Sequence, residues 1–356
     1  MLTRRDAIGG IGAAAALLGT SNPALAQRRA RKGPRLRPGD TVGVIAPAGV
    51  PSDPADYDRA LQRVSSLGLV PKPGLHLRER HGYLAGPDPA RAADVNAMFA
   101  DRNVKAILAI RGGWGCARLL PYLDWGVIRA NPKLLAGFSD ITALHLAIAA
   151  RGGFPTIHGP NIGSDWGPQS LATFQRLAFE AATPMLEEAP ALPIAAGSPG
   201  TAPVATAPLP APRRTRAIRP GRATGRLLGG NLTVLAALVG TPYLPSFAGA
   251  ILFLEDVGEA EYRVDRMLTQ LALAGHFRGL AGVVFGQCTR CASPDPGPES
   301  VSLDMVLDNH FWRLGIPAFT GAWFGHISNQ LNIPVGVRAE IDAEAGSIRV
   351  LEPAVA

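Results

Sequence analysis

The chain has 356 residues, of which 47% are hydrophobic and 18% are charged. A chain of this length exceeds one average domain, and its composition is that of a folded protein rather than of a disordered or fibrous one. The formal charge is +7. Its basic clusters at residues 28–37 and 213–222 lack interleaved aromatic residues, which gives no support to nucleic-acid binding. We interpret them as solvated linkers, with binding to anionic polymers or membrane surfaces as the alternative.

Residues 1–27 have the pattern of a signal peptide: a charged start, a small apolar stretch at 8–19 and an Ala-Leu-Ala ending. The apolar stretch is too short to anchor the chain in a bilayer whose core is ~30 Å thick. Arg4 and Arg5 indicate the twin-arginine export route, and we expect cleavage after Ala26. The chain is therefore expected to be periplasmic.

From Pro38 onward, short apolar runs alternate with helical stretches, which predicts βαβ units. The result is an α/β fold whose amino-terminal domain, residues 36–182, carries a doubly wound, mostly parallel sheet. Extended segments are expected at 70–77, 104–110 and 133–138, and helices at 55–67, 90–99 and 141–150.

Residues 183–222 are rich in Pro, Ala and Arg and have little periodicity. Such a segment does not readily continue a sheet or a helix, so we place the connection between two domains there. The second domain then occupies residues 223–356. Within it we expect strands at 250–254 and 280–285, a helix at 262–274, and a terminal β-hairpin at 335–350.

A candidate nucleophile lies in Gly137-Phe138-Ser139-Asp140, between a predicted buried strand and a predicted helix. A serine at such a turn is held out of the sheet as in a nucleophile elbow. Helix amides after it favour negative charge on a nearby oxygen. The alternative is that Ser139 or Asp140 only caps the helix.

A second loop, Arg111-Gly-Gly-Trp-Gly115, also follows a predicted buried strand, so it opens at the same carboxyl edge of the sheet. An amide of this loop is a candidate second donor for an oxyanion hole, a contact whose loss typically costs ~3 kcal/mol. The alternatives are a tight turn or a phosphate cradle. Neither glycine-rich phosphate motif is present, which weakens the cradle interpretation.

A serine nucleophile needs a base and an acid that orients the base. Of the seven histidines, His326 lies in a loop after an apolar segment, where a side chain faces a cleft. Glu255 and Asp256 end a strongly hydrophobic strand, where a carboxylate must be paired or hydrogen-bonded. The residues alone do not rank Glu255 above Asp256.

Cys288 and Cys291 form a CxxC motif. A structural zinc site needs two further ligands, and the sequence offers no second CxxC or HxxxH motif. Free thiols are the expectation, with a local disulfide or a redox role as alternatives.

Six segments occur in the order and approximate spacing of a known family, and the resemblance spans nearly all of the chain after the predicted signal peptide. The six segments, which are spread from Gly39 to Gly336, are GDTVGVIAPAG, RGGWGCARLLPYLD, GFSDITALH, GRLLGGNLTVL, ILFLEDVGEAEYRVDRML and GHISNQLNIPVG. On these segments the chain resembles the LD-carboxypeptidase family of serine peptidases, which includes the microcin-immunity peptidases.

The resemblance implies a catalytic triad and the groups around it. The triad comprises Ser139 as nucleophile, His326 as base and Glu255 as the orienting acid. The implied oxyanion donors are the Asp140 amide and an amide of Gly112 or Gly113, and the assigned substrate-binding residues are Trp114 and Asn231. No metal or other cofactor is implied.

The resemblance also implies a smaller, β-rich carboxy-terminal domain and assembly as a homodimer. The implied reaction releases terminal D-alanine from a murein tetrapeptide, by cleaving its amide to the L-centre of a diamino acid. Alternatives are an amidase acting on a peptidyl or aminoacyl nucleotide, and a non-catalytic periplasmic protein that binds wall peptides. The chain departs from the family in carrying Trp114 where many relatives have Tyr, and in the length of its Pro/Ala/Arg segment.

Overall fold

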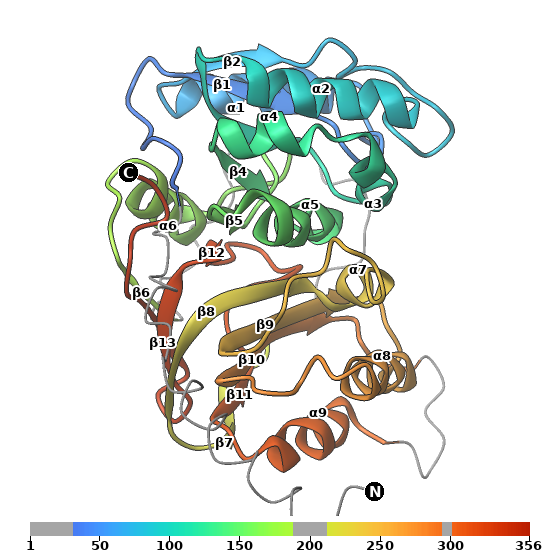
Figure 1. Cartoon of the computed structure of the whole chain (residues 1–356), viewed down its shortest axis with the longest axis vertical. Coiled ribbons are helices and arrows are strands. Elements are labelled where there is room, and N and C mark those ends of the chain that lie inside the picture. The colour runs from blue at the N-terminus through green and yellow to red at the C-terminus, as the bar shows by residue number, and fades with distance from the viewer. Residues whose placement is uncertain (1–30, 188–211, 294–300) are drawn as a thin grey trace, which may run out of the picture. The chain divides into compact units, whose positions relative to one another are not determined.

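Two β-sheets organise the computed structural model, which describes residues 31–187, 212–293 and 301–356 (Figure 1). These residues all belong to one unit, Arg31–Ala356. The predicted signal peptide at 1–27 lies outside them. Within the described ranges, no helix combines the length and the apolar character needed to cross a membrane.

The first sheet has six strands in the order β12-β5-β4-β3-β1-β2, and all neighbours are parallel except β12 and β5. Its strands are β1 (Thr41–Ile45), β2 (Val70–Pro73), β3 (Val104–Ala109), β4 (Leu134–Gly137), β5 (Thr156–His158) and β12 (Ile333–Val335). This confirms the predicted α/β fold with a mostly parallel amino-terminal sheet.

Helices cross between these parallel strands, as βαβ connections require. In α1, buried Tyr57, Ala60 and Val64 recur at helical spacing and supply the face that packs on the core. The helices are α1 (Ala55–Ser66), α2 (Asp88–Ala100), α3 (Cys116–Leu119), α4 (Trp125–Ala130), α5 (Thr142–Ala147) and α6 (Pro168–Ala178). Short helical turns are η1 (Leu120–Tyr122), η2 (Ser139–Ile141) and η3 (Ile148–Gly152).

The second sheet has eight strands in the order β6-β14-β13-β8-β9-β10-β11-β7, with a parallel centre formed by β8 to β11. Its strands are β6 (Met185–Leu186), β7 (Arg216–Arg219), β8 (Arg222–Asn231), β9 (Ala250–Val257), β10 (Gly282–Thr289), β11 (Ala318–Thr320), β13 (Arg338–Asp342) and β14 (Ser347–Val350). Strands β13 and β14 form the hairpin predicted near the end of the chain.

The central strands β9 and β10 are buried along almost their whole length, because helices cover a parallel sheet on its faces. Figure 1 shows α8 and α9 beside each other along β9 to β11. The helices of this part are α7 (Leu232–Ala237), α8 (Glu261–Leu273), α9 (Leu303–Phe311) and the turn η4 (Trp312–Leu314). The helix predicted at 262–274 is α8.

Three short strands link the two parts of the chain. Strands β6 and β7, from the segment at 183–222, pair at opposite ends of the second sheet, while β12, from residues 223–356, completes the first sheet. The predicted domain boundaries themselves stay a prediction.

The expectation of free thiols at Cys288 and Cys291 is wrong, because these residues form a disulfide. After β10 the chain turns at Arg290, whose φ is 58°, and the amide of Cys291 donates to the carbonyl of Cys288. The turn brings the two Cα atoms to 5.3 Å, within the range that a disulfide spans. Cys116 is free and buried.

Candidate active site

Ser139 is the first residue of η2 and lies in the strained turn that follows β4. Its φ of 63° lies in the left-handed region, which residues other than glycine rarely adopt. Just before it, Gly137 has a φ of 154°, and a Cβ there would lie 2.8 Å from Oδ1 of Asn161. The same Oδ1 accepts a hydrogen bond from the amide of Phe138 at 3.1 Å. The strand end is thus held in a shape that carries the serine out of the sheet, the geometry of a nucleophile elbow.

Asp140 is fully buried and ties this turn to the glycine loop, residues 111–115. Its Oδ2 accepts a hydrogen bond from the amide of Cys116, the first residue of α3, at 2.7 Å. Burial raises the pKa of the Asp140 carboxyl. The N-cap residues of η2 and α5 are Phe138 and Ile141, and neither makes a side-chain capping hydrogen bond, so the structure does not place Ser139 or Asp140 as the cap of the helix that follows.

The glycine loop passes directly over the serine. A Cβ at Gly112 would lie 2.9 Å from Cβ and 3.2 Å from Oγ of Ser139, so only glycine fits without displacing a neighbour. The carbonyl of Gly112 accepts a hydrogen bond from the amide of Gly49 at 3.0 Å. Because N–H and C=O point in opposite directions across a trans peptide, the Gly113 amide is turned away from Gly49. Among the described residues it has no hydrogen-bond partner.

Glu255 and His326 form a hydrogen-bonded pair, with Oε2 and Nδ1 2.7 Å apart. Glu255 is completely buried, whereas the imidazole of His326 keeps 19% of its surface exposed. A Cβ at Gly325 would lie 3.0 Å from Oε2, so glycine lets this loop approach the carboxylate. When Nδ1 donates to the carboxylate, Nε2 is left as the acceptor, which is the tautomer a general base needs.

Electrostatics favour the charged forms of this pair. Burial opposes ionisation of Glu255, but the charge and hydrogen bond of His326, together with smaller contributions from His158 and Asn231, outweigh it and lower the carboxyl pKa. Burial likewise opposes protonation of His326, and the charge and hydrogen bond of Glu255 raise the imidazole pKa above its ordinary value. The pair therefore stabilises the imidazolium that forms when the base accepts a proton.

The rings of Phe138 and His326 lie with their centroids 4.8 Å apart. Since Phe138 precedes Ser139 in the chain, the structure brings His326 to the serine turn. Among the described residues, no hydrogen bond joins the Ser139 hydroxyl to His326. Such catalytic hydrogen bonds are often long in enzymes without substrate.

Strand alternation separates Glu255 from Asp256. Successive side chains of β9 point to opposite faces, so only one of them reaches His326. Asp256 instead accepts hydrogen bonds from Nδ2 of Asn231 at 3.0 Å and from the Thr233 amide and hydroxyl at 2.9 Å. Burial, together with the nearby Glu255 charge, raises the pKa of Asp256 to about 6.

The two assigned substrate-binding residues differ in exposure. Trp114 is 43% exposed in the glycine loop, so its ring is accessible. Asn231 is buried at the start of α7: Nδ2 contacts Asp256, and Oδ1 accepts a hydrogen bond from the amide of Val234. The substrate-binding role of both residues stays a prediction.

His158, which the sequence did not single out, lies beside the other oxygen of the same carboxylate. Its Nε2 is 3.9 Å from Oε1 of Glu255, and both side chains are fully buried. Burial lowers the pKa of His158 to about 4, so the ring is neutral at pH 7. In the sequence His158 ends a three-residue strand, Thr156–His158, that contains one apolar residue, and its partner Glu255 is distant along the chain, so little pointed to the pair.

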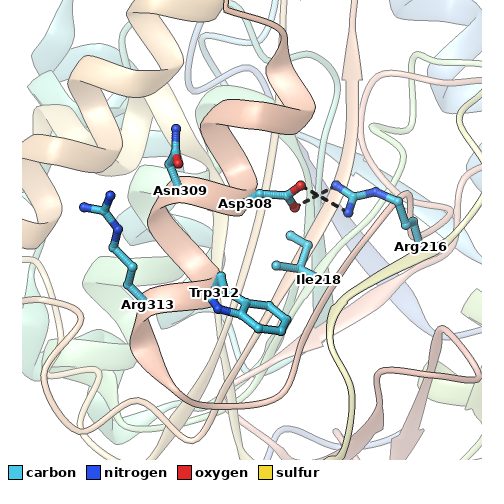
Figure 2. A pocket seen from close by; sticks show the side chains of 6 residues that line it. All are labelled: Arg216, Ile218, Asp308, Asn309, Trp312 and Arg313. Atoms are coloured by element: carbon cyan, nitrogen blue, oxygen red, sulfur yellow. Dashed lines mark hydrogen bonds and ion pairs between the residues drawn. The ribbon is translucent and has the colours of Figure 1, made fainter.

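Two cavities lie outside this cluster. One of about 360 Å³ lies between β7 and α9, where Arg216 and Asp308 form an ion pair at 2.9 Å and Trp312 lines the wall (Figure 2). Another of about 220 Å³ lies beside the glycine loop and is lined in part by Arg111 and Ser52. Neither includes the Glu255–His326 pair. The described residues contain no group of three or more His, Cys, Asp or Glu placed to hold a metal.

Comparison with known proteins gives two family matches. Residues 42–159 match the model of the LD-carboxypeptidase N-terminal domain, and residues 224–341 match that of the LD-carboxypeptidase C-terminal domain. Both matches include residues of the cluster: Ser139 lies in the first, and Glu255 and His326 lie in the second.

Individual proteins are similar over most of their length. A probable murein peptide carboxypeptidase of Bacillus subtilis is 38% identical over 90% of this chain and 94% of its own. A murein tetrapeptide carboxypeptidase of Pseudomonas aeruginosa is 33% identical over 85% of this chain and 92% of its own. The solved structure of an MccF-like protein of Bacillus anthracis is 27% identical with a TM-score of 0.74, covering 90% of this chain and 99% of that one.

Proposed function

The chain belongs to the LD-carboxypeptidase family and is an enzyme of that serine carboxypeptidase family, and from this premise we propose that it releases the terminal D-alanine of a murein tetrapeptide. The bond cleaved joins D-alanine to the L-centre of a diamino acid, meso-diaminopimelate or lysine. The observation that carries the proposal is the Glu255–His326 hydrogen bond beside the strained turn of Ser139.

Ser139 is the nucleophile in this proposal and His326 is its base. As the hydroxyl attacks the scissile carbonyl, Nε2 of His326 accepts its proton and the Ser139 oxygen bonds to the carbonyl carbon. Glu255 holds the imidazole through Nδ1 and stabilises the resulting cation.

The tetrahedral oxyanion is stabilised by backbone amides in this proposal. Asp140 follows the nucleophile directly, and its amide is the first donor. The Gly113 amide, which has no partner among the described residues and belongs to the loop against Ser139, supplies the second. Rigid donors of this kind stabilise charge only as it develops, so they accelerate the chemical step.

Collapse of the intermediate breaks the carbon–nitrogen bond. His326 returns its proton to the departing amine of D-alanine, which leaves an ester between Ser139 and the tripeptide. Water, deprotonated by His326, then attacks that ester and restores the serine hydroxyl.

Export to the periplasm and a homodimeric assembly belong to the proposal as well. The pattern of residues 1–27 supports export, and so does the Cys288–Cys291 disulfide, because disulfides persist in oxidising compartments. The dimer rests on the family resemblance, and the molecular mass measured in solution by light scattering tests it.

The test incubates the mature protein with free and muramyl tetrapeptides and measures released D-alanine, with Ser139→Ala as the matched variant. The proposal expects release by the parent and none by the variant. If no tetrapeptide is cleaved, the substrate assignment is wrong. If Ser139→Ala turns over at the parent rate, the nucleophile assignment is wrong.

A second candidate is an amidase that cleaves a peptidyl or aminoacyl nucleotide. The exposed ring of Trp114 in the glycine loop favours it, because such a ring can stack on a nucleobase. Release of nucleotide in place of D-alanine would establish this activity. Binding of tetrapeptide with no product after long incubation would instead indicate a non-catalytic wall-peptide binding protein.

A further inference from the structure

The carbonyl of His326 accepts a hydrogen bond from the hydroxyl of Thr289, at 2.8 Å. Thr289 is the last residue of β10 and is only 4% exposed. It stands between the two half-cystines of the CxxC motif, which the proposed reaction does not use. Thr289 therefore links the two: it lies within the loop that the disulfide closes, and its hydroxyl bonds to the candidate base His326.

Thr289 is fixed from two sides. Its own carbonyl accepts a hydrogen bond from the amide of Gly258, which follows β9, at 2.9 Å. On the other side, the disulfide closes the turn from Cys288 to Cys291, and Cys288 pairs in register with Asp256 of β9. The turn cannot open while the disulfide is intact, so the Thr289 hydroxyl stays directed at the His326 loop.

His326 is then held at both of its ends by neighbouring strands. Its ring bonds to Glu255 of β9, and its carbonyl bonds to Thr289 of β10. Because β9 and β10 are hydrogen-bonded neighbours in one sheet, the two anchors keep a constant separation. A loop histidine with both anchors has little freedom to rotate away from Ser139.

We propose that Thr289 is a positioning residue for His326 and that the Cys288–Cys291 disulfide maintains it, so that reducing this disulfide slows turnover. The inference rests on the proposed function in taking His326 as the base. It adds a residue and a redox dependence that the triad alone does not contain.

The reductant is a small dithiol. One of its thiolates attacks a sulfur of the disulfide and forms a mixed disulfide, releasing the other cysteine as a thiolate. The second thiol of the reagent then closes on its own sulfur and frees the remaining cysteine. Two electrons pass to the protein, which gains two thiols, and the reagent becomes a cyclic disulfide.

We expect the fold to survive loss of this disulfide, because only two residues lie between the cysteines and a closed loop this short constrains the unfolded chain less than a long one does. The disulfide thus fits a local clamp better than a scaffold for the whole domain.

The first test compares Thr289→Val with Thr289→Ser. Valine keeps the shape and removes the hydroxyl, whereas serine keeps the hydroxyl. Displacing a catalytic group by about 1 Å costs up to ~100-fold, so we expect Thr289→Val to lower kcat roughly 10- to 100-fold with KM little changed. Thr289→Ser should recover most of the rate.

The matched control is Thr241→Val. The Thr241 hydroxyl also donates to a backbone carbonyl, that of Leu238 at 2.7 Å, and although Thr241 is less buried than Thr289, no hydrogen bond joins it to His326 or Ser139 among the described residues. The Thr241→Val variant should retain the parent kcat. An equal loss of kcat in Thr241→Val and Thr289→Val would reduce the effect to general destabilisation and overturn the proposal.

The second test reduces the parent with a dithiol and compares it with the Cys288→Ser/Cys291→Ser double variant. We expect reduction to lower the parent kcat to the level of the double variant, reoxidation to restore it, and the dithiol to leave the double variant unaffected. Equal kcat in the oxidised parent, the reduced parent and the double variant would show that the disulfide has no part in positioning His326.

A third measurement keeps this proposal separate from the proposed function. The titration of the His326 ring is followed by NMR in the oxidised parent, the reduced parent and Thr289→Val, and it needs no substrate. Loosening of His326 from Glu255 should return its raised pKa toward the ordinary value in the last two samples. If D-alanine is not released but the titration shifts, the substrate is wrong and the positioning stands. If D-alanine is released and neither kcat nor the titration changes, the positioning is wrong.

Discussion

Nε2 of His158 lies 3.9 Å from Oε1 of Glu255, while the other carboxylate oxygen of Glu255 bonds to His326. Oε1 has no hydrogen-bond partner among the described residues, and neither does either ring nitrogen of His158. A small rotation of either side chain would allow the neutral imidazole to donate to the carboxylate. The buried acid is thus flanked by two imidazoles, of which only His326 reaches solvent.

Replacing His158 should weaken the hold of Glu255 on His326, although His158 itself is buried away from the substrate. His158→Phe removes the imidazole N–H that such a rotation would direct at Oε1, and a buried polar group left without a donor costs about 1–3 kcal/mol. We expect kcat to fall about tenfold, which corresponds to a rise of roughly 1.4 kcal/mol in the activation free energy. His158→Gln, whose amide can donate, should lose less. Equal rates in both variants and the parent, measured by D-alanine release, would rule out a contribution of His158.

The pH dependence should report the Glu255–His326 pair. His326 acts as a base only when its imidazole is neutral. The value of kcat/KM should therefore be low at acid pH and rise as the pH passes through the pKa of His326. Because Glu255 raises that pKa despite burial, the acid limb should lie above the ordinary histidine value of about 6.5.

Glu255→Gln removes the charge that favours the imidazolium. Its residual activity should be lower, and its acid limb should move to lower pH than in the parent. The measurement is kcat/KM between pH 5 and pH 9 for both proteins. An acid limb that stays in place after this substitution would assign the titration to another group.

Strain at Ser139 should appear as a trade between stability and activity. A non-glycine residue in the left-handed region costs of order 1 kcal/mol, which glycine avoids. Ser139→Gly should therefore be inactive and about 1 kcal/mol more stable to urea than Ser139→Ala, because relief of the left-handed strain exceeds the entropy that glycine adds to the unfolded chain. Ser139→Ala, which keeps the strain, is the control. Equal unfolding free energies for the two variants would argue against strain at this turn.

Gly112 should tolerate no side chain. A Cβ there would lie 2.9 Å from Cβ of Ser139, so Gly112→Ala must displace the serine turn or the loop. We expect kcat to fall at least tenfold, since about 1 Å of displacement costs up to ~100-fold. The control is Gly126→Ala in α4, where the nearest atom is the end of the Asp124 side chain, and alanine favours a helix. If Gly112→Ala releases D-alanine at the parent rate, the glycine loop is not part of the active site.

Much of the fold was predictable because its signals are local. Alternating apolar runs and helical stretches require parallel strands joined by helices, and the carboxyl ends of β3 and β4 then place the glycine loop and Ser139 at one edge. The choice between Glu255 and Asp256 was beyond the reach of composition and spacing, because both end the same strand. The pleat of β9 decides it by sending them to opposite faces.

The amino-acid sequence by itself determined the fold class, the two glycine-flanked turns and, through the order of its motifs, the family. Only the tertiary structure decided which groups meet: Glu255 with His326 and His158, Thr289 with the carbonyl of His326, and Cys288 with Cys291. The physical reason is that strand and helix patterns arise from neighbours along the chain. The contacts of buried polar groups depend instead on strand register, loop path and burial, which distant parts of the chain set together.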